Sequence, residues 1–206
     1  MKRTNPNPAR KSAVPGGHGL FMYKGMYQTS QSTEFERVLK PFFEEQQFTD
    51  IVEIGTFKGG FTLFMRDTLP HASVTTYDIV NHGVNFLADN NVSFIETNVF
   101  DYSTQTVVDE TFKARIENSE KLLLAIDGFD KPSEFAAVAK LMRPGDTIMV
   151  HDFVQDDATA DEFHEQGKWH WFETFGKDID PICEEHNLNP IYPESLEVVW
   201  AIRRKS

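Results

Sequence analysis

The feature that most constrains the fold is a regular alternation of short apolar runs with segments of helical periodicity. The apolar runs occupy residues 50–55, 73–78, 92–96, 122–126 and 147–150, and helical spacing marks residues 33–47, 61–69 and 132–141 between them. Strands that alternate with helices pair in parallel through crossover connections. The pattern therefore predicts an α/β fold with a mostly parallel sheet and helices on both of its faces.

Further details of the pattern order the sheet. Residues 122–126 are continuously apolar, as a strand buried on both faces should be, so they are expected to form the central strand. Residues 196–203, behind Pro193, are expected to add a C-terminal antiparallel strand. The expected fold class is a Rossmann-like three-layer sandwich with a mostly parallel seven-stranded sheet. We also expect Ser32 or Thr33 to cap the first helix in a capping box with Glu36, and residues 163–185 to be mostly helical.

Composition limits the class of protein. The 206 residues contain no Pro/Gly/Ser-rich linker after residue 30, so we expect a flexible arm at 1–19 and one domain at 20–206. A net charge of −12 argues against a nucleic-acid partner and favours a small-molecule substrate. Cys183 is the single cysteine, and no apolar run is long enough to span a membrane. These features predict a cytoplasmic protein and leave homo-oligomer formation open.

Polar residues stand at the carboxyl end of each apolar run. They are Glu53, Asp78, Asn98 with Asp101, Asp127, and the pair His151-Asp152. One such residue alone is more often a turn former or a helix cap. Because ligands of open parallel sheets bind beyond the carboxyl ends of the strands, their recurrence after every strand favours a functional site there.

A glycine-rich segment, Glu53-Ile-Gly-Thr-Phe-Lys-Gly-Gly60, follows the first of these strands. Glycine lets the backbone turn sharply and approach a ligand at a helix N-terminus. The segment lacks both the G-x-G-x-x-G dinucleotide fingerprint and the phosphate-binding G-x-x-x-x-G-K-[ST] pattern. A turn with a purely structural role is the alternative interpretation.

The Glu-x-Gly-x-x-x-Gly form of this segment resembles motif I of class I S-adenosylmethionine-dependent methyltransferases. Together with residues 25–32, Ala125-Ile-Asp-Gly128, and Pro144-Gly145 leading to Val150-His-Asp-Phe153, it resembles the cephalosporin hydroxylase and rhamnosyl O-methyltransferase group. That group shares its site plan with catechol-type, metal-dependent O-methyltransferases. The likeness covers residues 20 to 155 and implies a small-molecule hydroxyl as methyl acceptor.

The resemblance also implies a set of cofactor-binding residues. Asp78 corresponds to the acid that accepts the ribose hydroxyls, and the segment after the third strand is expected around the adenine, with Phe100 against a ring face. The full set is Gln31, Glu53, Gly55, Thr56, Gly59, Gly60, Asp78, Asn98, Phe100 and Asp127.

By the same resemblance, Asp127, His151 and Asp152 match three residues that hold a divalent metal. An imidazole in this set favours manganese, iron or zinc over magnesium, and it departs from the acid or amide usual in the group. The alternative makes Asp127 a hydrogen-bond partner of the cofactor and His151 a capped core histidine. Without a metal, a protonated His151 would have to relieve the repulsion of the two carboxylates.

The catalytic set implied by the group is Asp127, Asp130 and Lys131. Lys131 would lower the pKa of the acceptor hydroxyl by its charge, or act as a base if desolvated; the alternative is a solvated lysine at a helix start. The aromatic cluster Trp169-His-Trp-Phe172, expected on a helix, is either core packing or a lid over the acceptor.

The sequence thus predicts an S-adenosylmethionine-dependent O-methyltransferase of small molecules, with or without a divalent metal. Three alternatives stay open: a NAD-dependent oxidoreductase, a non-catalytic relic of the methyltransferase fold that still binds the cofactor, and a metal-dependent hydroxylase. The missing third glycine and the Glu before Gly55 argue against the oxidoreductase.

Overall fold

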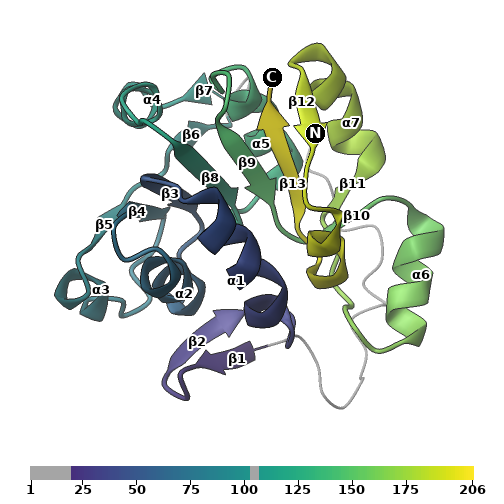
Figure 1. The fold of residues 1–206 in the computed structure, drawn as a ribbon, viewed down its shortest axis with the longest axis horizontal. Helices are drawn as coiled ribbons and strands as arrows, with labels where there is room; N and C mark the ends of the chain where they lie inside the picture. The colour runs from purple at the N-terminus through teal and green to yellow at the C-terminus, as the bar shows by residue number, and fades with distance from the viewer. Residues whose placement is uncertain (1–19, 103–106) are drawn as a thin grey trace.

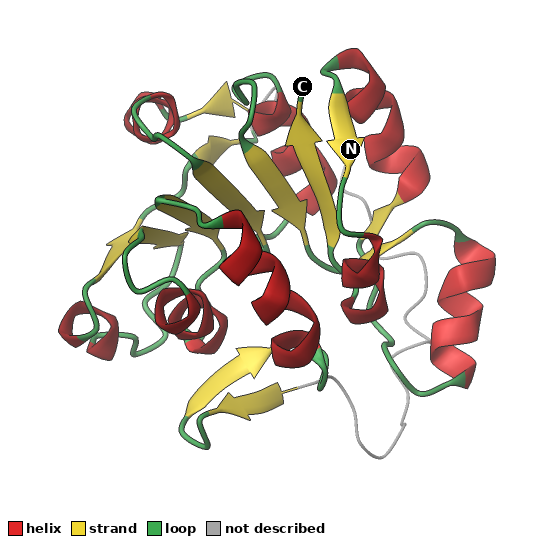
Figure 2. Cartoon of the chain, viewed as in Figure 1, coloured by secondary structure: helices red, strands yellow, loops and turns green. Residues whose placement is uncertain are grey.

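One seven-stranded sheet organises the computed structural model, which describes residues 20–102 and 107–206 (Figures 1 and 2). The predicted arm at 1–19 lies outside these residues. The strand order is β12 (Leu188–Pro190), β13 (Ala201–Lys205), β9 (Thr147–Val150), β8 (Leu122–Ile126), β3 (Asp50–Ile54), β4 (Ser73–Asp78) and β5 (Val92–Glu96). Strands β9, β8, β3, β4 and β5 pair in parallel, and β13 is antiparallel to β9. The predicted fold class is confirmed, and β8 is the central strand.

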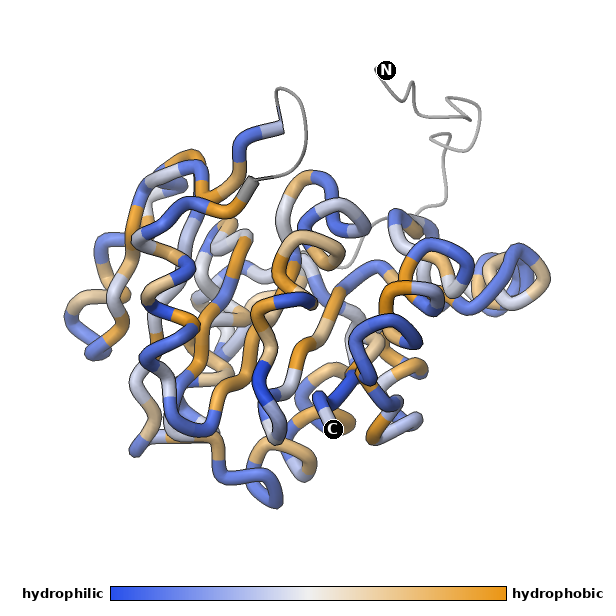
Figure 3. Tube along the Cα trace, turned by 90° about the horizontal axis from the view of Figure 1, so that it is seen from above, coloured by the Kyte–Doolittle hydropathy of each residue, from blue (hydrophilic) through white to orange (hydrophobic). Residues whose placement is uncertain are grey.

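Helices cover both faces of the sheet. On one face lie α1 (Phe35–Gln46), α2 (Gly60–Thr68), the short α3 (Phe86–Asp89) and the 3-10 helix η2 (Pro193–Val198); on the other lie α4 (Glu110–Glu117), α5 (Lys131–Ala139) and α7 (Gly176–Glu185). Successive residues of β8 alternate between two apolar clusters, Leu123 and Ala125 in one, Leu122, Leu124 and Ile126 in the other. Figure 3 shows hydrophobic stretches running through the middle of the chain trace, with more hydrophilic stretches toward the outside.

Smaller elements flank the sheet. A hairpin of β1 (Leu20–Tyr23) and β2 (Tyr27–Ser30) packs beside α2, and β6 (Phe100–Asp101) pairs with β7 (Val107–Val108). Helix α6 (Asp157–Glu165) stands to one side, between β10 (Phe153–Val154) and its parallel partner β11 (Thr174–Phe175) (Figure 1). No helix among the described residues has the length and apolar character needed to cross a membrane.

Three local predictions were wrong. Helix α1 begins after Glu34 without a side-chain cap, one residue beyond the predicted caps, and the buried Ser32 hydroxyl has no hydrogen-bond partner among the described residues. Residues 163–185, expected to be mostly helical, are helical only at 163–165 and 176–185: α6 ends at Glu165, Gly167 takes a left-handed conformation, and α7 begins at Gly176. The last strand starts at Ala201 rather than 196, since Pro193 begins a 3-10 helix there.

Gly55, at the end of β3, is fixed by a close approach of the chain to itself. Its φ is +93°, and a Cβ at this position would overlap the backbone carbonyl of Asp127. The amide of Asp127 donates to the carbonyl of Ile54 at 2.8 Å, so the β3–β8 ladder continues to the edge of the sheet. The turn after β3 and the residue after β8 are thereby in direct contact.

We predict that Gly55→Ala destabilises the fold more than a left-handed conformation alone explains. Gly145 is a matched control, because its φ is +92° and a Cβ there would meet nothing within 4 Å. Gly145→Ala should lose about 1–2 kcal/mol of unfolding free energy from backbone strain, and Gly55→Ala more, since backbone must also move. Urea denaturation measures both; equal losses would contradict the close approach.

Candidate functional site

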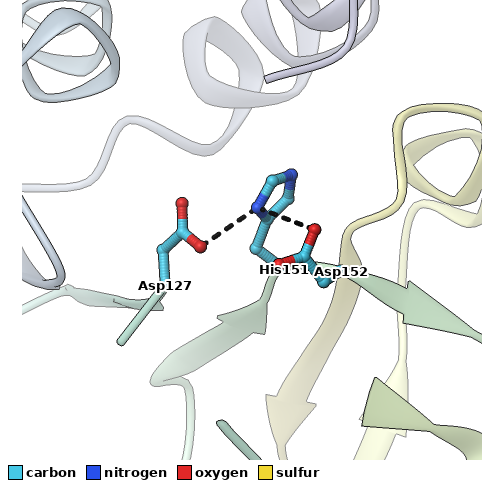
Figure 4. Close-up of side chains that lie close together, drawn as sticks. All are labelled: Asp127, His151 and Asp152. Atoms are coloured by element: carbon cyan, nitrogen blue, oxygen red, sulfur yellow. Dashed lines mark hydrogen bonds and ion pairs between the residues drawn. The ribbon is translucent and has the colours of Figure 1, made fainter. Parts of the chain in front are cut away.

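The residues that follow β8 and β9 converge at the carboxyl edge of the sheet. Nδ1 of His151 lies 3.1 Å from Oδ1 of Asp127 and 3.5 Å from Oδ1 of Asp152. One potential ligand atom from each residue lies within 4.8 Å of the others, and Figure 4 shows the three side chains pointing toward one another. The predicted convergence of these three residues is confirmed.

Asp152 is held in a strained conformation. Its φ of +54° is unusual for a residue with a side chain. The carbonyl of Asp152 accepts the amides of Glu173 and Thr174, each at 3.1 Å, and Trp169 Nε1 donates to its Oδ1 at 3.0 Å. The segment before β11 therefore fixes both the backbone and the carboxylate of Asp152.

Lys131 is the positive charge inside this cluster. It is only 4% exposed, and its Nζ lies 2.5 Å from Glu173 Oε2, 2.9 Å from Asp152 Oδ2 and 3.5 Å from Asp127 Oδ1. Burial lowers the pKa of Lys131, but the carboxylates of Asp152, Asp127 and Glu173 outweigh burial and raise it above its usual value. The alternative of a solvated lysine at the helix start is wrong. The ammonium of Lys131 relieves the repulsion between the carboxylates, which was not foreseen from the sequence.

His151 is enclosed by two tryptophans. The ring is 1% exposed, with its centroid 4.6 Å from Trp200 and 5.4 Å from Trp169. Burial lowers the pKa of His151, but the nearby carboxylates of Asp127 and Asp152 raise it above its ordinary value. Nε2 is buried and has no hydrogen-bond partner among the described residues.

Gln31 connects Asp127 to Trp200, which packs against His151. Its Nε2 donates to Asp127 Oδ2 at 3.2 Å, and its Oε1 accepts from Trp200 Nε1 at 2.8 Å. Trp200 and Glu173 are residues that the sequence did not reveal, because both follow the end of the recognised motifs and no spacing links them to Asp127.

Asp78 ends β4 on the other side of the Gly55 turn. Its Oδ2 accepts the amide of Phe57 at 2.8 Å and its Oδ1 accepts the amide of Val80 at 3.1 Å. Ile79 and Val80, which follow it, are exposed apolar residues, Ile79 by 61%. Two aliphatic residues directly after a strand-end acid are a sequence signal that our sequence analysis overlooked.

Glu53 and its partners lie beneath the turn rather than on it. Its Oε2 accepts the hydroxyls of Thr62 and Thr76, both at 2.5 Å, and the Thr56 hydroxyl lies 2.6 Å from that of Thr76. Burial raises the pKa of Glu53 to about 8. Gly60 packs against the backbone of Gln28, so this glycine also serves a close approach within the chain.

Three predicted residues have partners outside the Asp127 cluster. Phe100 is buried in the core, with its ring 6.2 Å from that of Phe112, which favours packing over contact with a ligand. Asn98 is exposed and accepts the amide of Phe100. Asp130 accepts the hydroxyl of Ser133 at 2.8 Å, within the first turn of α5.

The aromatic cluster at 169–172 lies in the loop between α6 and β11, not on a helix as expected. Trp169 is buried beneath His151, whereas Phe172 packs on Phe163 of α6, with ring centroids 5.9 Å apart. Trp169 is therefore part of the site's wall.

Comparison with known proteins supports the fold assignment. No family model and no curated protein sequence matches the chain. A structure of CmcI with SAH has a TM-score of 0.58 at 13% identity, over 99% of this chain and 95% of that chain. A CmcI structure described with Mg and SAM has a TM-score of 0.60 at 13% identity, over 100% and 88%.

Human N-acetylserotonin methyltransferase in complex with SAM has a TM-score of 0.53 at 12% identity, over 84% of this chain and 52% of that chain. At such identities the likeness establishes the fold. The chain shares the Rossmann-like α/β fold of these solved structures, in agreement with its strand order.

We predict that Glu53→Gln reduces the loss of stability that accompanies a rise in pH toward about 8. A group whose folded-state pKa is raised stabilises the protein below its unfolded value of 4.5, and this contribution is lost as pH rises through about 8. Each pH unit between those values removes at most about 1.4 kcal/mol. The amide keeps an acceptor for both threonine hydroxyls but carries no charge.

Thermal unfolding from pH 5 to 9 measures the effect, with Glu96→Gln at an exposed strand end as the control. The melting temperature of Glu53→Gln should fall less steeply than that of the wild type, while the control follows the wild type. Parallel curves for all three proteins would show that Glu53 does not titrate in this range.

Proposed function

We propose that the chain is an S-adenosylmethionine-dependent methyltransferase that methylates a hydroxyl group of a small molecule. The observation that carries this proposal is the placement of Asp78 and Asp127 on either side of the Gly55 turn, at the carboxyl edge of a methyltransferase-type sheet. Open α/β sheets bind their ligands at this edge. The net charge of −12 fits a small-molecule acceptor better than a nucleic acid.

The residues around Asp78 suit the nucleoside part of the cofactor. Each carboxylate oxygen of Asp78 accepts one backbone amide and retains a lone pair for a ribose hydroxyl. The exposed side chains of Ile79 and Val80 offer an apolar surface to a purine ring. We assign this apolar role to them in place of Phe100.

The residues after β8 suit the acceptor. When bound, S-adenosylmethionine supplies an electrophilic methyl group, so the protein chiefly has to align the hydroxyl and weaken its hold on its proton. The ammonium of Lys131 lowers a neighbouring hydroxyl pKa by its charge, and its three carboxylate partners keep it protonated, which argues against a role as base. Phe129, 84% exposed beside Asp127, offers a ring surface to the acceptor.

The alternatives fit less well. A nicotinamide-dependent oxidoreductase would be expected to carry the third glycine of its fingerprint. A non-haem hydroxylase is expected to bind iron through two histidines and one carboxylate, whereas this cluster has one histidine and two carboxylates. A relic without activity would have no evident reason to keep four buried or half-buried charged groups together.

A divalent cation fits the Asp127 cluster, and we include it in the proposal. Donor atoms about 3.1 and 3.5 Å apart suit adjacent ligands of one ion, and three carboxylates outnumber the single ammonium of Lys131. The ligands would be Asp127, His151 and Asp152, and the imidazole favours manganese over magnesium. The ion would orient the acceptor hydroxyl and lower its pKa.

We predict that Asp78→Ala weakens the binding of S-adenosylhomocysteine by about 1–3 kcal/mol, roughly 5- to 150-fold. The ribose hydroxyls would lose their acceptor. Calorimetry on the purified variant measures this, and Asp89→Ala, an exposed acid of α3, is the control. An unchanged dissociation constant for Asp78→Ala would remove this residue from the site, and no binding by the wild type would overturn the proposed function.

We predict that Mn²⁺ binds the wild type and that Lys131→Met binds it more tightly, because removing the ammonium takes away the charge that competes for Asp127 and Asp152. The signal of free Mn²⁺ in electron paramagnetic resonance reports binding, with Asp127→Asn as the variant expected to lose it. Absence of binding by all three proteins at millimolar Mn²⁺ would leave a metal-independent methyltransferase.

A further inference from the structure

Glu134 is a buried carboxylate that belongs to none of the groups described above. It lies in the first turn of α5 and is 1% exposed. Its Oε1 accepts three hydrogen bonds, from the Tyr102 hydroxyl at 2.6 Å, the Phe129 amide at 3.0 Å and the Asp130 amide at 3.1 Å. One oxygen atom therefore joins two segments of chain that meet at the carboxyl edge of the sheet.

These two segments come from different parts of the chain, and only the first carries a residue of the proposed site. Phe129 and Asp130 belong to the turn 127–130, which leads from β8 into α5 and contains Asp127. Tyr102 directly follows β6, on the segment that the sequence analysis assigned to the adenine side. Tyr102 and Glu134 themselves are 32 residues apart along the chain.

The sequence of the turn is adapted to this carboxylate. A Cβ at Gly128 would overlap the Glu134 carboxyl group, and Gly128 has no left-handed φ, so this glycine provides space for the carboxyl group rather than a special conformation. Oε2 is buried without a hydrogen-bond partner among the described residues. Burial raises the pKa of Glu134, so an acid at this position costs stability that an apolar residue would not.

We propose that Glu134 is a positioning residue that fixes the turn 127–130 and couples it to the segment ending at Tyr102. Because it is buried, it acts through the turn and does not touch the ligands. It holds the amides on both sides of the exposed Phe129 ring, and so keeps that ring and the Asp127 carboxylate in fixed relative positions. The effect on ligand binding rests on the proposed methyltransferase function, whereas the effect on the turn does not.

The experiment compares Glu134→Ala, Glu134→Gln and Tyr102→Phe with the wild type. Amide hydrogen exchange of Phe129 and Asp130, measured by NMR, reports the turn, and calorimetry with S-adenosylhomocysteine reports the site. In Glu134→Ala both amides should exchange about tenfold faster or more, since each loses its hydrogen-bond acceptor, and S-adenosylhomocysteine should bind several-fold more weakly. Glu134→Gln should keep the exchange rates and the affinity of the wild type, because the amide carbonyl oxygen of Gln can accept hydrogen bonds from the same three donors.

Tyr102→Phe tests the coupling in case Glu134→Ala does not fold. It removes one hydroxyl from an exposed residue, so the melting temperature should stay near that of the wild type while S-adenosylhomocysteine affinity falls several-fold. Tyr192→Phe is the matched control, because its hydroxyl donates a similar bond, at 2.7 Å to the carbonyl of Val38, away from the turn. It should leave the affinity and the exchange of Phe129 and Asp130 unchanged.

Each result decides the proposal. Unchanged exchange of both amides in Glu134→Ala, or in Tyr102→Phe together with unchanged affinity, overturns it. A lower melting temperature of Glu134→Ala with unchanged affinity would reduce Glu134 to a cap of α5. If the wild type itself binds no S-adenosylhomocysteine, the methyltransferase proposal fails, and the exchange measurements still decide whether Glu134 fixes the turn.

Discussion

The buried ion pairs of Lys131 are the interaction on which the candidate site depends. Lys131 is the first residue of α5, where the helix dipole disfavours a positive charge. Burial disfavours it further, so the side chain is stable there only because Asp127, Asp152 and Glu173 surround the ammonium. The three acids in turn need the lysine, since two of them end neighbouring strands and would otherwise repel each other.

These ion pairs also organise the C-terminal part of the chain. Glu173 reaches Lys131 from the loop between α6 and β11, and Trp169 in the same loop donates to Asp152. Asp152 makes these contacts from a strained backbone conformation, with a φ of +54°. The loop, the strained residue and the lysine therefore depend on one another, and the 166–174 segment takes its position from the site rather than from helical periodicity.

The difference between local and non-local information explains what the sequence could predict. The close approach of Gly55 to Asp127 is a property of the β3–β8 register. That register joins two apolar runs that the sequence shows directly. Strand-end residues such as Asp78 and Asp127 were found because parallel topology brings the carboxyl ends together. Lys131 was found by resemblance, but its burial was not, because its partner Glu173 lies 42 residues away.

Phe100 and Glu53 show that a motif match does not predict where a side chain points. Their positions in the sequence matched a motif, yet Phe100 faces the core and Glu53 accepts threonine hydroxyls beneath the turn. In a strand, successive side chains point to opposite faces, so a motif fixes the position of a residue along the chain more firmly than its direction. For Glu53 this direction has a chemical consequence. A carboxyl group with a pKa of about 8 can stay neutral beneath a site that already holds three carboxylates, and its proton keeps a fourth negative charge away from the ligand.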